Sequence, residues 1–460
     1  MSTLPQRPSS QTEVLFVNHA SLLIKVGDQY LLTDPWHQRP AFGSWLPIPP
    51  MAVHPANLVA LGDKLRILIS HAHDDHCDDQ FLKLFDKQTP IISTNFASKS
   101  VERRVGKLGF QRLHMLSPAG ESVGPFRVRS FVNDKLSLDD ALYLIETPDA
   151  VIVHCNDMWV ALEEPARACI RQAVAEKSGA RSLYASQTNS ASGFPTTYRT
   201  FTRQERASLL QKKVAGMIRT GLQNAAAVGA AHFLSYAGFS GAFVRGKEAY
   251  LDDAIFPDRD YVVQNLGAEI PAGVTVLDMR PGDAFDFAAV KKSFFGNDVP
   301  APALKQAAIA YYHATGAVDA CDTFRAAPGP GQGAVEAGKA VFEKQLDDYL
   351  LTFDKFVTAT VDRTRFEPTI LGKVFNVVVE DLSVSRSLRF GAGLVEQQTP
   401  WNKQLLVSSR LMAMVIERQI LLENLYTGFN AEFSRSPPDV YNRDIVMYLV
   451  MFSYAYINRR

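Results

Sequence analysis

This 460-residue sequence has few cysteines, no formal net charge and no long apolar run. Its four cysteines are too few and too scattered for a disulfide framework, which favours a reducing compartment, the cytoplasm. Lys plus Arg equals Asp plus Glu at 48 each, so neither nucleic acid nor an anionic membrane is indicated as the main partner. No apolar run is long enough to span a bilayer, and the polar first residues do not resemble a signal peptide. What remains is an ordinary globular composition, 47% hydrophobic and 21% charged.

Histidine is also scarce, yet three of the ten histidines fall within six residues. The run His71-Ala-His73-Asp-Asp75-His76 follows the apolar stretch 67–69, which predicts that it lies where a β-strand ends. Because His71 and His73 are two residues apart, they can point the same way and share one metal ion. Asp75 and His76 lie on the following turn and can reach a second ion. Since imidazole and carboxylate groups are the usual ligands of transition metals, the run predicts two adjacent metal ions.

The rest of the chain predicts an N-terminal half of strands broken by helices and a different C-terminal part. Strands are expected in the apolar runs 14–26, 28–34, 67–69, 91–95, 126–132, 141–146, 151–157 and 228–239, with a hairpin turn at 27–28. Helices are expected at 78–87, 98–109, 301–325, 334–357 and 403–426, with strands within 358–400 and a linker at 327–333. Two domains follow: a catalytic domain over residues 1–295, and an accessory domain over 296–460 that shapes the pocket or mediates dimerisation.

The histidine run matches the HxHxDH signature of the metallo-β-lactamase superfamily. The segments VNHASLLI, LLTDPW and VIVHCND resemble the first strand, the second strand and the metal-bridging strand of that superfamily. The resemblance covers about residues 14–260 and implies an α/β fold, an αββα sandwich with a dinuclear metal site at one edge. It also gives Asp157 the role of bridging the two ions, and Asp34 the role of supporting the ligands from behind.

Two positions depart from the pattern of the superfamily's hydrolases. Where those enzymes carry a further His on the first ion, this sequence has Asn133 and Asp134, which predicts a carboxylate ligand, Asp134. The last His of the pattern could be His232, which could equally be a core residue on an apolar strand. A carboxylate in place of an imidazole favours iron or manganese over zinc.

These departures, with FVND, LYASQTNSASGFP and FLSYAGF, resemble the dinuclear iron oxygenase branch of the superfamily, the CMP-N-acetylneuraminate hydroxylase-like proteins. The Rieske module of that enzyme is not matched, because no Cys-x-His pairs with Cys-x-x-His. The resemblance implies a dinuclear non-haem iron monooxygenase that hydroxylates or oxidises a small-molecule metabolite, receives electrons from an external reductase, and can form a homodimer. The expected metal ligands are His71, His73, Asp134, Asp75, His76, His232 and the bridging Asp157, with Asp75 and Asp157 as the catalytic pair.

Two alternatives remain open at this point. In the first, the metals are zinc, and the protein is a hydrolase of an ester, an amide or a phosphodiester in which Asp75 orients the nucleophile. In the second, the protein is a non-catalytic scaffold that kept the fold; retention of the whole HxHxDH run argues against it.

Overall fold

The structure is a computed structural model of the 460-residue chain. It describes residues 11–457 apart from 38, 51, 118, 133–138, 157, 178, 190–191, 245, 294–298, 327–337, 362–367 and 441. Two of the predicted ligands, Asp134 and Asp157, lie outside the described residues, as does the predicted linker.

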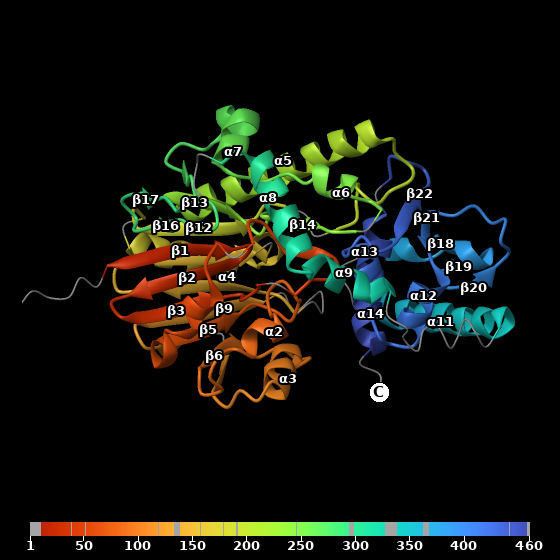
Figure 1. The fold of residues 1–460 in the computed structure, drawn as a ribbon, viewed down its shortest axis with the longest axis horizontal. Helices are drawn as coiled ribbons and strands as arrows, with labels where there is room; N and C mark the ends of the chain where they lie inside the picture. The colour runs from red at the N-terminus through yellow and green to blue at the C-terminus, as the bar shows by residue number, and fades with distance from the viewer. Residues whose placement is uncertain are drawn as a thin grey trace, which may run out of the picture.

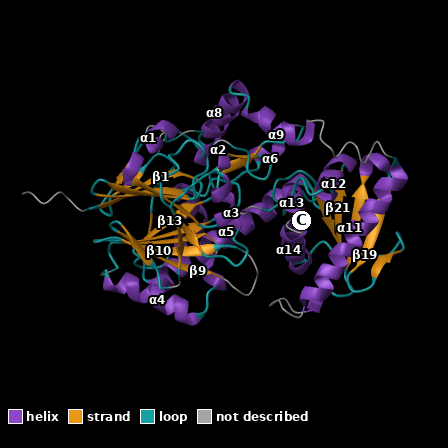
Figure 2. Cartoon of the chain, turned by 90° about the horizontal axis from the view of Figure 1, so that it is seen from below, coloured by secondary structure: helices purple, strands orange, loops and turns teal. Residues whose placement is uncertain are grey.

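Two sheets packed face to face form the N-terminal part of the molecule (Figures 1 and 2). The first has the strand order β17 (Val290–Lys291), β16 (Ala284–Phe285), β1 (Thr12–Asn18), β2 (Ser21–Val26), β3 (Gln29–Thr33), β5 (Leu65–Ile69), β6 (Ile91–Thr94), β7 (Leu113–Leu116). The second has the order β15 (Thr275–Val276), β13 (His232–Tyr236), β12 (Ser182–Gln187), β11 (Val151–Asn156), β10 (Ala141–Glu146), β9 (Phe126–Val132), β8 (Glu121–Val123). A short pair, β4 (Trp45–Pro47) with β14 (Ser240–Ala242), lies apart from both sheets.

Helices cover the outer faces of this sandwich. They are α1 (Pro55–Val59), η1 (Gly62–Lys64), α2 (Asp79–Leu82), α3 (Ser100–Lys107), η2 (Met158–Ala161), α4 (Glu164–Glu176), α5 (Arg203–Val228), α6 (Ala249–Asp252), α7 (Arg259–Leu266), η3 (Gly267–Glu269), α8 (Ala301–Ala314) and α9 (Ala317–Ala326). The predicted αββα sandwich is therefore confirmed.

The alternation of side chains along β10 shows why the sequence folds into layers. Tyr143 and Ile145 point into the core between the two sheets, whereas Leu142 and Leu144 pack against the helices on the outside. Because both faces of the strand are buried, its sequence is a continuous apolar run. Successive side chains point to opposite faces and so enter two different cores.

A smaller unit follows at the C-terminus, coloured cyan to blue in Figure 1. Its sheet has the order β20 (Gly393–Val395), β19 (Val384–Arg389), β18 (Val374–Val379), β21 (Lys403–Val407), β22 (Glu432–Arg435). Its helices are α11 (Lys339–Thr360), η5 (Pro368–Ile370), η6 (Glu380–Leu382), α12 (Ser409–Ile416), α13 (Leu422–Tyr426) and α14 (Arg443–Ile457). We call residues 339–457 the C-terminal unit.

The prediction of a single helix over 403–426 is wrong. The segment is divided into strand β21 and helices α12 and α13. Residues 403–407 alternate between buried and half-buried, and β21 pairs with β18 on one side and β22 on the other. Ser408 then caps α12 by accepting a hydrogen bond from the backbone N–H of Leu411. The apolar content suits a helix equally well, and only pairing with distant strands selects the strand. The strand predicted over 228–239 is shorter than expected and begins at His232, because α5 continues to Val228.

The division of the chain near residue 295 stays a prediction. Helices α8 and α9, which follow it, pack Leu304, Tyr312 and Cys321 onto the hydrophobic core of the N-terminal part. The separate core of the C-terminal unit starts with Phe342 on α11 and includes Tyr198 from the N-terminal part.

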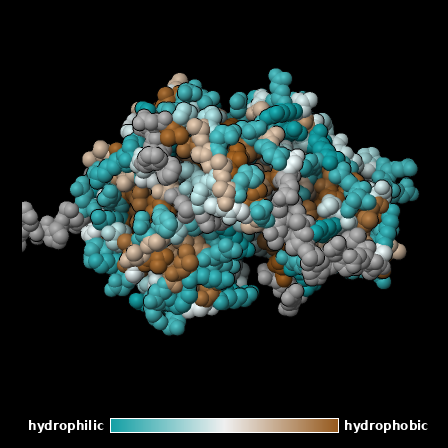
Figure 3. Space-filling view, viewed as in Figure 1, coloured by the Kyte–Doolittle hydropathy of each residue, from teal (hydrophilic) through white to brown (hydrophobic). Residues whose placement is uncertain are grey.

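The surface in Figure 3 is mostly hydrophilic, with hydrophobic areas between. None of the helices in the described part of the chain combines the length and the apolar character needed to cross a membrane.

Candidate metal centre

The ends of strands from both sheets meet at one edge of the sandwich. His19 follows β1, Asp34 follows β3 and His71 follows β5, all in the first sheet. The second sheet contributes Asp140, just before β10, and Asn156 at the end of β11. Because ligands of α/β proteins commonly bind beyond the ends of strands, this edge is where a site is expected.

Asp34 fixes the histidine run through contacts with Ser70 and His76. Its Oδ1 accepts the backbone N–H of Ser70 at 2.7 Å, and its Oδ2 accepts the Ser70 hydroxyl at 2.7 Å. Its Oδ2 also lies 2.8 Å from Nδ1 of His76. This contact fixes the His76 ring and leaves Nε2 directed at Asp75, whose Oδ2 is 3.6 Å away. The supporting role expected of Asp34 therefore fits its position.

His71 and His73 face each other through one nitrogen each. His71 Nε2 lies 2.7 Å from His73 Nδ1. The other nitrogen of His71, Nδ1, contacts the Ser70 hydroxyl at 2.9 Å and lies 3.5 Å from Oδ1 of Asp140. The pair thus turns two ring nitrogens toward a common point, as expected of residues that share one ion.

A second group consists of Asp75, His76 and His19. One ligand atom from each lies within 4.8 Å of the others, and all three residues are buried. His19 Nε2 is 3.1 Å from Asp75 Oδ2, while Asp75 Oδ1 is buried and has no hydrogen-bond partner in the described part of the chain. A buried carboxylate oxygen without a partner is costly unless a cation is near. The group has the donor chemistry of a metal site.

Burial and neighbouring charges set the protonation of these groups. Burial lowers the pKa of His71 well below its usual range, and burial also lowers the pKa of His19. Burial alone would lower the pKa of His76 as well, but the carboxylates of Asp75 and Asp34 raise it to about 9. Neutral imidazoles are ready to bind a metal, and His76 lies where positive charge is stabilised most strongly.

Several residues at this edge have left-handed backbone conformations that side chains rarely adopt. The φ angles are 40° for His19, 40° for Asp34, 50° for Asn156 and 54° for Ala237. Each such residue costs on the order of 1–3 kcal/mol and persists only where the surroundings enforce it. The strain gathers where strands must turn their terminal side chains toward one another.

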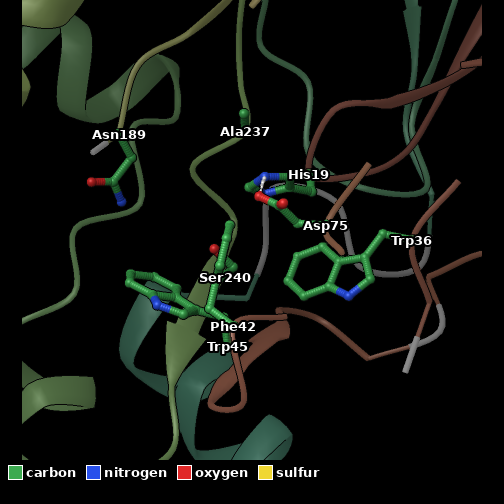
Figure 4. A pocket seen from close by; sticks show the side chains of 8 residues that line it. All are labelled: His19, Trp36, Phe42, Trp45, Asp75, Asn189, Ala237 and Ser240. Atoms are coloured by element: carbon green, nitrogen blue, oxygen red, sulfur yellow. Dashed lines mark hydrogen bonds and ion pairs between the residues drawn. The ribbon is translucent and has the colours of Figure 1, made fainter. Parts of the chain in front are cut away.

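A pocket opens beside the second group (Figure 4). Its lining combines aromatic rings, neutral polar groups and two residues of that group: Trp36, Phe42, Trp45, Asn189, Ala237, Ser240, His19 and Asp75. The indole N–H groups of Trp36 and Trp45 donate to the backbone oxygens of Arg39 and Thr427 at 2.8 and 2.7 Å. The polar edges of these two rings are therefore already paired, and the rings offer carbon surfaces to the pocket.

The structure brings four of the seven predicted metal residues together: His71, His73, Asp75 and His76. It does not bring His232 to them. That residue begins β13 and packs on Phe285 and Phe287, whereas the other end of the strand, Tyr236, donates its hydroxyl to Asn156 at the site. Four residues of strand separate the two ends by about 13 Å, so His232 is in the wrong place for a ligand. It is a half-buried residue that packs on aromatic rings, as in the alternative to a ligand role.

Three residues at the centre were missed by the sequence reasoning. His19 lies within the segment VNHASLLI that resembles the superfamily's first strand, and its place just after a strand was the available signal. Asp140 lies six residues after the expected Asp134, and its Oδ1 is 3.5 Å from Nδ1 of His71, the ring nitrogen that does not face His73. Glu423, on α13 of the C-terminal unit, places Oε2 3.7 Å from His73 Nε2, and nothing local in its sequence indicates this.

The chain is similar to several known proteins. A family model described as "Beta-lactamase superfamily domain" matches residues 13–170. A protein of Mycolicibacterium smegmatis named for a Rieske 2Fe-2S iron–sulfur centre is 26% identical over 351 residues, 72% of this chain and 65% of that protein. The cytidine monophosphate-N-acetylneuraminic acid hydroxylase of Asterias rubens is 38% identical over 85 residues, 18% of this chain and 12% of that protein. The chain thus spans less than two thirds of the length of these relatives.

Solved structures show weaker similarity. The diiron β-hydroxylase CmlA from Streptomyces venezuelae matches with 14% identity and a TM-score of 0.35, over 60% of this chain and 52% of CmlA. A possible metal-dependent hydrolase from Veillonella parvula matches with 14% identity and a TM-score of 0.38, over 60% of this chain and 99% of that protein. Neither similarity is close enough to indicate an activity.

The match to the family model spans the whole histidine run and the strands that carry His19, Asp34 and Asn156 to the site. Residues 13–170 of this chain are therefore a β-lactamase superfamily domain, as the HxHxDH run predicted.

Proposed function

We propose that this protein is a dinuclear iron enzyme that hydroxylates or oxidises a small-molecule metabolite. The observation that carries the proposal is the number of carboxylates around the histidines. Asp75 lies within the cluster as a candidate ligand. Two further carboxylates, Asp140 and Glu423, add negative charge from behind, at the ring nitrogens of His71 and His73 that do not face the shared ion. Mixed sets of imidazole and carboxylate suit iron or manganese better than sets of imidazole alone.

The residues present fit two metal ions. His71 Nε2 and His73 Nδ1, 2.7 Å apart, are close to the roughly 3 Å expected of two nitrogens bound to one ion at about 2.1 Å. Asp75 and His76 would hold the second ion, with His19 in the place once expected of His232. The bridging role of Asp157 and the ligand role of Asp134 remain predictions.

The surrounding side chains perform the remaining tasks. Asp34 holds His76 with Nε2 directed at the second group, and thereby fixes which nitrogen can bind. The rings of Trp36, Phe42 and Trp45 exclude water and hold the apolar part of a substrate beside Asp75 and His19. Bound iron would supply the redox chemistry with O₂ that oxidation of a C–H bond or an amine requires.

Electrons would come from a separate donor, as the resemblance implied. The M. smegmatis relative is named for a Rieske centre, which makes a protein of that type the first donor to test. This sequence has no Cys-x-His pair of its own to hold such a centre.

A zinc hydrolase is the second candidate, and one observation favours it. His19 adds an imidazole to the second group, and zinc accepts sets of His with Asp readily. In that case the pocket would place an ester, amide or phosphodiester beside Asp75.

The first experiment identifies the metal and the reaction together. The protein is produced with iron and without oxygen, its metals are measured by mass spectrometry, and O₂ uptake is followed after a chemical reductant is added. Two irons per chain with reductant-dependent O₂ uptake support the oxygenase. Two zincs with turnover of a generic ester or phosphodiester, and no O₂ uptake by the iron-loaded protein, would contradict it and support the hydrolase.

Two matched pairs of variants then test the ligands. Asp75→Asn should remove about one ion per chain, whereas Asp74→Asn should keep both, because Asp74 faces Arg104 with its Oδ1 2.7 Å from Nη2. His19→Gln should likewise lose one ion, whereas His232→Gln should bind as the wild type. Loss of metal in the His232 variant, with none in the His19 variant, would restore the original prediction.

A further inference from the structure

Two helices of the C-terminal unit reach the histidine run. Glu423 on α13 is buried, and its Oε2 lies 3.7 Å from His73 Nε2. Tyr454 on α14 donates its hydroxyl to the same Oε2 at 2.6 Å. The ring of Tyr454 also stacks on that of His73, with ring centroids 5.9 Å apart. A carboxylate and a phenol from a separate unit thus face one residue of the candidate metal centre.

The orientation of the His73 ring determines which of its nitrogens faces Glu423. Its Nδ1 faces His71 Nε2 at 2.7 Å, so its Nε2 is left pointing away from the site, toward Glu423. Asp34 stands in the same relation to His76, contacting the ring nitrogen that does not face the second group. Metal-binding histidines almost always donate their other N–H to a carboxylate, a carbonyl or water, which fixes the ring and strengthens the ligand.

The charge of Glu423 also needs an explanation. Only 7% of the residue is exposed, and no Lys or Arg in the described part of the chain forms an ion pair with it. A buried carboxylate is costly unless positive charge compensates it. The residue that faces it is His73, and an ion bound to this ring would supply that charge.

The rest of the interface holds α13 in place independently of Glu423. Ser44 Oγ donates to the backbone oxygen of Gly428, and Trp45 Nε1 donates to that of Thr427 at 2.7 Å. Asn430 Nδ2 donates to the backbone oxygen of Phe42 at 3.1 Å. These bonds join the loop that walls the pocket to the end of α13.

We propose that Glu423 is a positioning residue for His73, held in turn by Tyr454, so that the C-terminal unit completes the metal centre. The inference rests on the metal site proposed above and not on the reaction. It assigns the C-terminal unit a role beyond pocket-shaping or dimerisation: through Glu423 it sets the affinity and geometry of the ion that His71 and His73 share.

The test uses Co²⁺, whose visible absorption reports ligand geometry, on the full chain freed of metal with a chelator. Glu423→Gln should lower the affinity for one of the two Co²⁺ ions by about 10- to 100-fold and shift the absorption of that ion, while the other ion binds as before. Glu423→Asp should lie between, and Tyr454→Phe should shift the absorption with a smaller loss of affinity. Glu432→Gln is the matched control, because that carboxylate of the same unit pairs with Arg199 and Lys247.

Each outcome decides between two claims. If Glu423→Gln binds both ions with the affinity and absorption of the wild type, the positioning role is overturned while the metal site stands. If the wild type itself binds no Co²⁺, the metal site fails first. Should Glu423→Gln not fold, as judged by circular dichroism, Glu423→Asp and Tyr454→Phe decide, and wild-type affinity and absorption in both would overturn the proposal.

Discussion

The N-terminal sandwich and the C-terminal unit contribute to the same site in opposite ways. In the sandwich the chemistry is local: His71, His73, Asp75 and His76 stand together in the chain and together in space. In the C-terminal unit Glu423 stands within the apolar sequence LLENLY and is 350 residues away from His73. A short motif reveals a site only where one loop supplies the ligands. Groups brought in by a second unit are visible only once the packing is known.

The two regions have separate hydrophobic cores. Removing a large side chain from either core should have the largest effect on stability. Phe353 on α11 is fully buried and stacks on Phe452 with ring centroids 4.6 Å apart. Phe353→Ala should cost about 3–5 kcal/mol of the free energy of unfolding of the C-terminal unit. Its counterpart in the sandwich, Phe126→Ala, should cost as much there. Calorimetry should show each variant shifting a different transition; a single transition shifted equally by both would remove the distinction between the cores.

A single added methyl group should test the interface between the two regions. A Cβ on Gly428 would lie 2.1 Å from the backbone oxygen of Phe42 and 2.3 Å from that of Asn424. Gly428→Ala should therefore push α13 from the pocket loop, cost about 1–3 kcal/mol and change the fluorescence of Trp45. The matched control is Gly216→Ala in α5, where a Cβ would meet nothing within 4 Å. This substitution should stabilise the folded protein by up to about 1 kcal/mol, because Ala favours a helix more than Gly does. Unchanged stability and fluorescence in Gly428→Ala would mean that the two regions are not docked as described.

A pH-dependent effect concerns Lys403, a cation buried in the C-terminal unit. Lys403 is 1% exposed among the rings of Tyr198, Tyr426 and Phe433, and burial lowers its pKa to about 7. Between pH 7 and about 10 the unfolded chain therefore binds the proton that the folded chain has lost, so stability should rise with pH over this range. Urea unfolding at pH 7 and pH 9.5 should show a rise that is about 3 kcal/mol smaller in Lys403→Met than in the wild type. An equal rise in both would show that Lys403 stays charged in the folded protein.

The sequence predicted the sandwich well because its strands carry their own signals. The hairpin turn at Gly27 has the positive φ of 63° expected of glycine, and β5 ends just before the histidine run as its apolar residues indicated. The helix prediction for 403–426 failed because apolar residues at these positions suit either structure. There the choice was made by pairing with β18 and β22, which are distant in the chain.

By itself, the sequence determined the superfamily fold and the run from His71 to His76, since adjacent ligands and strand patterns are local properties. Tertiary structure alone decided which other groups join them. It placed His19 beside Asp75 and Glu423 beside His73, and it left His232 at the far end of its strand. The physical reason is that a residue type fixes what a group can bind, whereas the distance between groups far apart in the chain depends on how strands pair and units pack.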